Sequence, residues 1–135
     1  GAKGGDWFGE VKKGENYGWK ILGWGGTNYD NSKIGPKWLP GFTKAIHYWV
    51  PSIAVSAIAI YQGKEFPEFN SLALITSLKD QSLRLLDFKD SKKINEEIIF
   101  KDTIGRIRDI KIHPESGKIF LLAQDKLWLF EKNTH

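Results

Sequence analysis

Residues 104–131, IGRIRDIKIHPESGKIFLLAQDKLWLFE, contain three apolar strand patterns separated by two turn signals. Alternating or continuous apolar residues over five or six positions are typical of β-strands. Residues 113–117, which include Pro114 and Gly117, favour one chain reversal, and Asp125 favours a second, tighter one. The stretch therefore predicts a three-stranded meander, with strands at Arg108 to His113, Lys118 to Ala123 and Lys126 to Glu131.

Four more strand patterns precede this meander and are separated by further turn signals. No segment shows a sustained helical period, although residues 65–70 predict one short helical turn. Seven short strands at near-regular spacing are typical of an all-β sandwich, barrel or propeller. The four additional strands are predicted at Ser56 to Gln62, Ser71 to Ser77, Ser82 to Phe88 and Glu96 to Phe100.

The strand spacing divides the chain into three stretches. Residues 51–103 predict one four-stranded antiparallel blade, and residues 104–135 predict most of a final blade. Residues 1–50 hold most of the glycine and five of the six tryptophans, and they predict long loops with short strands. A propeller blade of three strands is commonly completed by a strand from elsewhere, which removes exposed edges. We therefore expect missing N-terminal blades or a homo-oligomer to complete this chain.

The composition excludes several classes of protein. Hydrophobic residues make up 41% and charged residues 27%, which is typical of a globular chain. The net charge of +4 is spread without a polybasic block, so nucleic acid is not an expected partner. No cysteine is present for a disulfide or thiolate site, and no apolar run reaches the length of a membrane span. The sequence begins with Gly-Ala-Lys and contains no methionine, so we expect a polypeptide that is processed, trimmed or taken from inside a longer gene.

Two arginines stand two residues apart, directly before the alternating run from Asp109 to His113. If this segment is a strand, Arg106 and Arg108 point to the same side and their guanidinium groups repel each other. A planar ligand that carries carboxylates or phosphates would satisfy both groups through bidentate hydrogen bonds. The alternative is a solvated strand face on which each arginine pairs with a nearby aspartate or glutamate.

An ordered set of short motifs resembles the C-terminal part of the soluble glucose/sorbosone dehydrogenase family. The motifs are Gly4-Gly5-Asp6, Asn16-Tyr17-Gly18-Trp19, His47-Tyr48-Trp49 with Pro51-Ser52-Ile53-Ala54, Leu78-Lys79, and Arg106-Ile107-Arg108-Asp109. The resemblance implies a six-bladed β-propeller, of which about two blades are present. It also implies a periplasmic or secreted quinoprotein that oxidises aldoses at the anomeric carbon with pyrroloquinoline quinone and calcium.

The same resemblance assigns roles to individual side chains. Pyrroloquinoline quinone is flat and carries three carboxylates, so its site needs in-plane cations, an aromatic face and a Lewis acid. By resemblance, Lys79, Arg106 and Arg108 contact the cofactor, and Trp49 lies against its plane. The alternatives are a surface lysine in a turn beside Asp80 and a tryptophan packed in the core.

The resemblance also implies a calcium site at the start of the chain. Gly1 and Ala2 align with a Gly-Pro pair whose backbone carbonyls reach the calcium, and carbonyl oxygens suit this hard cation. The chain departs from the family pattern here, because Ala2 replaces the proline. Residues Trp7-Phe8-Gly9 also stand where the family usually has a glutamate, an apolar residue and an asparagine.

No catalytic residue is predicted within this chain. The proton-abstracting histidine of the family lies in the N-terminal half of the propeller, and neither His47 nor His113 matches it. A general base contributes roughly 10²–10⁴-fold in rate, so we expect this chain alone to be an inefficient dehydrogenase. Two alternatives stay open, a non-catalytic module that stacks aromatic rings on carbohydrate and an interaction propeller without chemistry.

Overall fold

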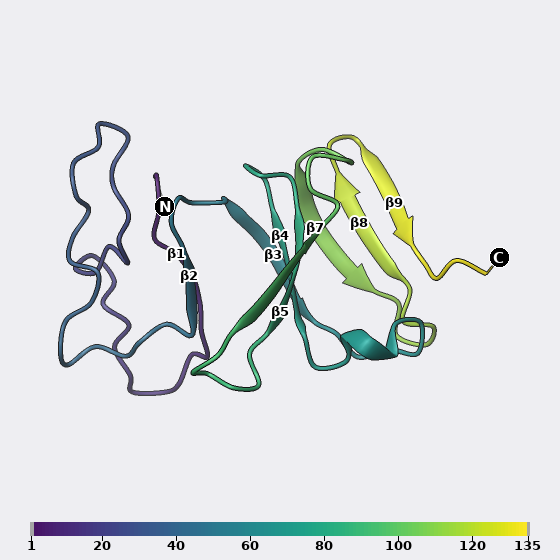
Figure 1. Cartoon of the computed structure of the whole chain (residues 1–135), viewed down its shortest axis with the longest axis horizontal. Helices are drawn as coiled ribbons and strands as arrows, with labels where there is room; N and C mark the ends of the chain where they lie inside the picture. Colours follow the sequence, from purple (N-terminus) through teal and green to yellow (C-terminus); the bar gives the residue numbers. More distant parts are fainter. Residues whose placement is uncertain (1, 135) are drawn as a thin grey trace. The chain divides into compact units, whose positions relative to one another are not determined.

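All paired strands in the structure run antiparallel to their neighbours. The computed structural model describes residues 2–134 and divides into two compact units, one up to Ala54 and one from Val55 onward (Figure 1). In this part of the chain the single helical element is a 3₁₀ turn, η1 (Pro67–Phe69), which lies inside the predicted helical turn. The prediction of an all-β chain with antiparallel sheets is confirmed.

The first unit consists mainly of loops around a two-stranded sheet. Strand β1 (Asp6–Phe8) pairs with β2 (His47–Trp49), so that Asp6 lies opposite Trp49. Gly18 turns the intervening chain at φ +76°, and a Cβ at this position would clash with the Leu22 side chain. Glycine alone fits this turn, because other residues meet both the strained φ and the clash. Strands β1 and β2 are three residues long each, and loops join them.

A buried carboxylate ties β1 to the segment that follows β2. Asp6 accepts hydrogen bonds from the Ser52 hydroxyl, from the Ile53 N–H at 3.1 Å and from the Ala54 N–H at 3.0 Å. Hydrogen bonds to a charged acceptor are stronger than neutral ones. The Ser52–Ala54 segment is therefore held by one side chain from a strand more than forty residues earlier.

The second unit contains two sheets whose strand order follows the sequence. Each of the seven predicted strands has a counterpart whose ends lie within two residues of the predicted ends, so this prediction is confirmed. The four-stranded sheet contains β3 (Val55–Ile60), β4 (Ala73–Ser77), β5 (Leu83–Asp87) and β6 (Asn95–Ile99). The three-stranded sheet contains β7 (Ile107–Ile112), β8 (Ile119–Ala123) and β9 (Lys126–Phe130).

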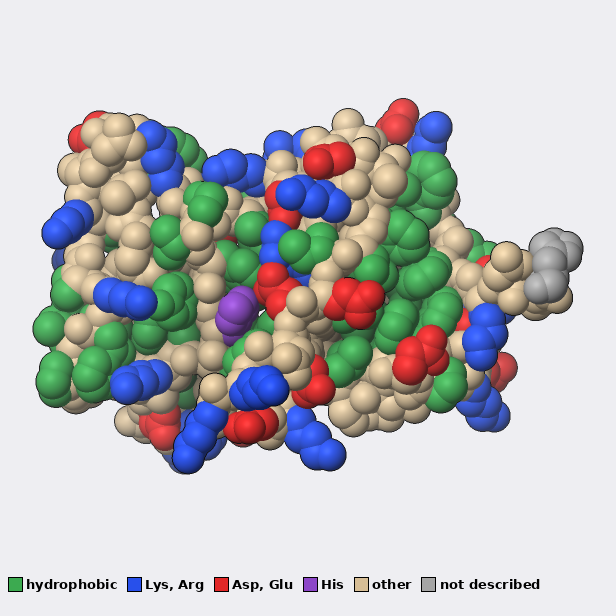
Figure 2. Space-filling view, in the orientation of Figure 1, with side chains coloured by type: hydrophobic (Ala, Val, Ile, Leu, Met, Phe, Trp, Pro, Cys, Tyr) green, Lys and Arg blue, Asp and Glu red, His purple; other side chains and the backbone are tan. Residues whose placement is uncertain are grey.

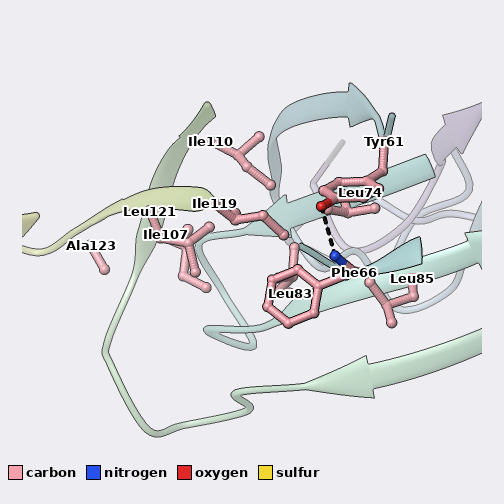
Figure 3. Close-up of a cluster of buried hydrophobic side chains, with 10 residues drawn as sticks. All are labelled: Tyr61, Phe66, Leu74, Leu83, Leu85, Ile107, Ile110, Ile119, Leu121 and Ala123. Carbon is pink, nitrogen blue, oxygen red and sulfur yellow. Dashed lines mark hydrogen bonds between the residues drawn. The ribbon is translucent and has the colours of Figure 1, made fainter. Parts of the chain in front are cut away.

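The hydrophobic core of the second unit joins these two sheets. Side chains from both converge, among them Leu74 and Leu83 from the first sheet and Leu121 from the second (Figure 3). Tyr61 is fully buried among them, and its hydroxyl accepts the Phe66 N–H at 3.1 Å and donates to the Gly117 carbonyl at 2.7 Å. Because the apolar faces of both sheets are buried in one core, the two sheets form a single compact unit.

The expected alternation through the two arginines is wrong. Ile107 pairs with Ala123 whereas Asp109 pairs with Leu122, so the register shifts between them and Arg108 lies in a β-bulge. Arg106 precedes the strand altogether. Because a bulge adds a residue and interrupts the two-residue period, Arg108 and Asp109 are exposed in succession.

Strand β9 forms one edge of the three-stranded sheet and has β8 as its partner in the described chain. Figure 2 shows hydrophobic side chains gathered over the region of β8 and β9. Exposed members of these two strands include Leu122, Leu127, Trp128 and Leu129. An apolar edge strand is a surface on which a further strand can pair. Its completion by a strand from elsewhere stays a prediction.

Candidate functional site

A hydrogen-bonded serine brings the end of β4 and the start of β7 together. The Ser56 Oγ donates to the Ile107 carbonyl at 2.6 Å and lies 2.7 Å from the Thr76 Oγ1. Because Ser56 donates its single hydroxyl proton to the Ile107 carbonyl, the Ser56 Oγ accepts the hydrogen bond from the Thr76 hydroxyl. The loops that follow β4 and precede β7 therefore emerge at the same end of the second unit.

Three cationic residues lie at this end, and we call Lys79, Arg106 and Arg108 the cationic end. Lys79 lies in the turn between β4 and β5, three residues beyond Thr76, and Arg106 directly precedes Ile107. The backbone of Arg106 is fixed, because its N–H donates to the Gln124 Oε1 at 3.1 Å and its carbonyl accepts the Gln124 N–H at 3.0 Å. The backbone thus brings these three predicted site residues to one end of the unit.

The side chains of the cationic end are exposed and unpaired. Within residues 2–134, none of the three makes a side-chain hydrogen bond or an ion pair. The nearest acidic residues in sequence are engaged elsewhere, because the Asp109 carboxylate accepts the Ile110 N–H at 2.8 Å and Asp80 binds another arginine. The alternative in which each arginine pairs with an acid is therefore not seen. Unpaired cations gathered at one end attract an anionic ligand.

A buried ionic network closes the turn that carries Lys79. The Arg84 guanidinium, 7% exposed as a residue, forms ion pairs with Asp80 and Glu96. The Asp80 carboxylate also accepts hydrogen bonds from the hydroxyls of Ser77 and Ser82, the latter at 2.8 Å. Sequence reasoning missed this network. The sequence feature that could have revealed the network is the polar residues Ser77, Asp80 and Arg84, which lie in and between the apolar strands β4 and β5.

This network sets a pH dependence of stability. Burial raises the pKa of Asp80, but hydrogen bonds from Ser77, Arg84 and Ser82 outweigh burial and hold the pKa below the ordinary value of 3.8. A carboxyl with a lowered folded-state pKa stabilises the fold above its unfolded pKa and loses that contribution as the pH falls through the folded value. We expect the chain to lose stability below about pH 3.8, and Asp80→Asn to flatten this loss in denaturation curves measured at several pH values. Equal acid sensitivity of the two proteins would contradict this prediction.

The remaining predicted site residues belong to the first unit. Trp49 is 6% exposed in β2, and the His47 ring meets it edge-on with centroids 4.9 Å apart. Ala2 is half-buried near the start of the described chain, and Gly1 lies outside the described residues. The structure therefore groups Lys79, Arg106 and Arg108, whereas the roles of Trp49, Gly1 and Ala2 stay predictions.

Two further findings concern residues 2–134. No cluster of three or more histidine, cysteine, aspartate or glutamate side chains has the arrangement to hold a metal ion. No helix in this range is long and apolar enough to cross a membrane.

The fold and the site together define an all-β protein with antiparallel sheets and three exposed cationic residues at one end of a unit. The family model described as Glucose / Sorbosone dehydrogenase matches residues 1–128. The chain belongs to this family, so the resemblance found in the sequence motifs is confirmed.

Curated relatives cover most of this chain. The Aldose sugar dehydrogenase YliI of Escherichia coli (strain K12) is 32% identical over 128 residues, which is 93% of this chain and 34% of that protein. The uncharacterized protein slr1608 of Synechocystis sp. is 29% identical over 125 residues, which is 91% of this chain and 30% of that protein. The chain thus spans about a third of the length of these relatives.

Solved structures show the same relationship. A crystal structure of a glucose dehydrogenase matches with a TM-score of 0.85 and 29% identity, over 100% of this chain and 40% of that one. The crystal structure of the soluble Aldose sugar dehydrogenase from Escherichia coli, in the apo-form, matches with a TM-score of 0.83 and 30% identity. That match covers 98% of this chain and 40% of that structure.

Proposed function

We propose that this chain is the C-terminal part of a quinoprotein that oxidises aldoses at the anomeric carbon with pyrroloquinoline quinone and calcium. Family membership over residues 1–128 and the partial coverage of the relatives support this proposal. One four-stranded and one three-stranded antiparallel sheet are consistent with about two blades of a six-bladed propeller. In this proposal, residues 1–50 are a loop-rich segment, residues 51–103 one blade and residues 104–135 most of the last blade.

The observation that carries the proposal is the cationic end. Three exposed cations without partners among the described residues suit a flat ligand with three carboxylates. Arg106 and Arg108 present planar guanidinium groups that bind carboxylates bidentately, and Lys79 offers a compact charge for a single oxygen. By resemblance, Trp49 is also predicted to contact the cofactor, and the carbonyls of Gly1 and Ala2 are predicted to bind the calcium.

The residues of this chain would bind and orient the cofactor. When bound, pyrroloquinoline quinone supplies the acceptor for the hydride that leaves the anomeric carbon of the sugar. Lys79, Arg106 and Arg108 hold the anionic ligand in place, and the turn closed by Arg84 and Asp80 fixes the backbone beside Lys79. The proton of the sugar hydroxyl needs a base outside the predicted site residues, so we expect no efficient turnover by this chain alone.

Binding of the cofactor tests the proposal directly. We expect the chain to bind pyrroloquinoline quinone saturably in equilibrium dialysis with calcium present. Arg106→Ala and Lys79→Ala should each weaken binding by about five- to tenfold, because solvent screens contacts at an exposed site. Raising the salt concentration should weaken binding of the wild-type chain as well, since the ligand is anionic.

Lys92→Ala is the matched control for this experiment. Lys92 is an exposed lysine in the β5–β6 turn, at the opposite end of the same sheet from Lys79. Its replacement changes the net charge equally and should leave cofactor affinity unchanged. Absence of saturable binding, or equal weakening in all three variants, would count against the cationic end as the cofactor site.

The proposal also includes a cellular location, a substrate and a mode of assembly. A periplasmic or secreted location and an aldose substrate follow from the resemblance, and missing blades or further copies would complete the β9 edge. Light scattering at high protein concentration tests whether further copies of the chain complete the β9 edge. A mass equal to one chain there would oppose completion by further copies.

A further inference from the structure

We propose that the first unit contains a saccharide-binding pocket, lined by none of the residues of the cationic end. This inference goes beyond the proposed oxidation chemistry and does not depend on cofactor binding. The pocket, which we call the aromatic pocket, lies within residues 4–34 of the first unit. Its lining includes Trp7, Tyr17, Trp19, Lys20, Leu22 and Trp24.

The size of the aromatic pocket suits a small ligand. Its volume is about 530 Å³, which falls inside the range of roughly 300–1,000 Å³ typical of small-molecule sites. One or two sugar rings fit this volume. Glycine backbone from residues 4, 5, 18 and 23 also lines the cavity, so the chain leaves room where side chains would fill it.

Stacked aromatic rings make one wall of the pocket rigid. The rings of Trp7 and Tyr17 are nearly parallel at 11°, with centroids 5.5 Å apart, and Trp24 lies 6.5 Å from Trp7. The Tyr17 hydroxyl accepts the Lys12 N–H at 2.8 Å and donates to the Glu10 carbonyl, which fixes the ring further. A wall held in this way is preorganised, so little entropy is lost when a ligand binds.

Trp19 offers the pocket a bare aromatic surface. Its side chain is 95% exposed, and it has no ring contact or hydrogen bond with other described residues. Gly18 holds the preceding turn at φ +76°, and its carbonyl accepts the N–H groups of Ile21 and Leu22 at 2.9 Å, so Trp19 is carried on a closed turn. A tryptophan is large and apolar, and covering its face stabilises a complex. The flat C–H face of a pyranose ring can stack on the Trp19 indole in this way.

Four residues that line the pocket carry side-chain N–H donors with no acceptor among the described residues. The indole N–H groups of Trp7, Trp19 and Trp24 make no hydrogen bond within the described chain, and the Lys20 ammonium makes no ion pair there. A saccharide presents many hydroxyl oxygens that accept hydrogen bonds, whereas a hydrocarbon ligand would leave these donors unused. One cation among aromatic rings also fits a neutral polyhydroxylated ring better than a multiply charged anion.

Saccharide titration of the whole chain without cofactor or calcium tests the pocket. We expect cellobiose or maltose to bind saturably with a dissociation constant of about 1–10 mM, measured by calorimetry and by saturation-transfer NMR. Sorbitol carries similar hydroxyls but has no ring face, and it should not bind. Trp19→Ala should weaken saccharide binding about tenfold or more, since it removes the exposed stacking surface.

Tyr29→Ala is the matched control for Trp19→Ala. Tyr29 is an aromatic residue of the same unit, 78% exposed, that does not line the aromatic pocket. Both changed side chains are on the surface, so both variants should fold as the wild type does, and circular dichroism checks this. Saccharide affinity should fall in Trp19→Ala and stay unchanged in Tyr29→Ala.

The outcomes separate this inference from the proposed cofactor site. Arg106→Ala should leave saccharide binding intact, and loss of binding in that variant would place the sugar at the cationic end instead. Absence of saccharide binding, or binding that survives Trp19→Ala unchanged, overturns the aromatic pocket. Neither of these last two results bears on cofactor binding by Arg106 and Lys79.

Discussion

Replacing Arg84 with alanine should lower the free energy of unfolding by about 3–5 kcal/mol, the largest effect we expect from a single change. The Arg84 guanidinium is nearly buried and is shared between the carboxylates of Asp80 and Glu96. Its removal leaves the partly buried Asp80 carboxylate without the Arg84 cation and takes one ion-pair partner away from Glu96. An uncompensated charge in such a place costs much more than a lost surface ion pair.

Urea denaturation followed by circular dichroism measures this change. Lys92→Ala in the neighbouring β5–β6 turn removes an exposed cation from the same sheet and should have little effect. The double variant Arg84→Met with Asp80→Asn should recover part of the stability, because it removes the carboxylate charge that Arg84 compensates and keeps the side-chain volume. A loss below about 1 kcal/mol for Arg84→Ala would show that the network behaves as a surface salt bridge.

Replacing Asp6 with alanine should destabilise the first unit by about 2–4 kcal/mol. Its carboxylate accepts hydrogen bonds from Ser52 and from the N–H groups of Ile53 and Ala54. Buried donors left without an acceptor cost free energy, because water solvates them in the unfolded chain. Asp6→Asn keeps an acceptor oxygen and should lose less stability than Asp6→Ala.

Hydrogen exchange gives this prediction a local readout. Exchange at the Ile53 and Ala54 amides should speed up in Asp6→Ala, whereas amides of the second unit should change little. Asp30→Ala is the control, because Asp30 accepts the Ser32 N–H at 2.9 Å in an exposed loop of the same unit. Equal effects of the two variants on stability would contradict a special role for the buried carboxylate.

Local sequence patterns predicted the strands of the second unit well. The apolar runs of β4 and β8 and the turn residues Pro114 and Gly117 depend on neighbours in the chain, so their signal is readable without tertiary contacts. The sequence of the first unit predicted its strands less clearly. Its strands β1 and β2 are three residues each and pair across nearly forty residues of loop, which no local periodicity records.

The candidate site was likewise predictable only in part from the sequence. Sequence motifs selected Lys79, Arg106 and Arg108, and they predicted that an anionic ligand would require several cations close together. They did not reveal the bulge at Arg108, because a bulge depends on the register against β8.

Residue type and spacing thus established the class of fold, the strands of the second unit and the kinds of side chain available for chemistry. Packing between distant segments decided where those side chains lie. The Ser56 hydroxyl joins β4 to β7, and Arg84 closes the turn beside Lys79. The Ser56–Ile107 hydrogen bond connects residues about fifty positions apart, and its energy exists only once the sheets have packed.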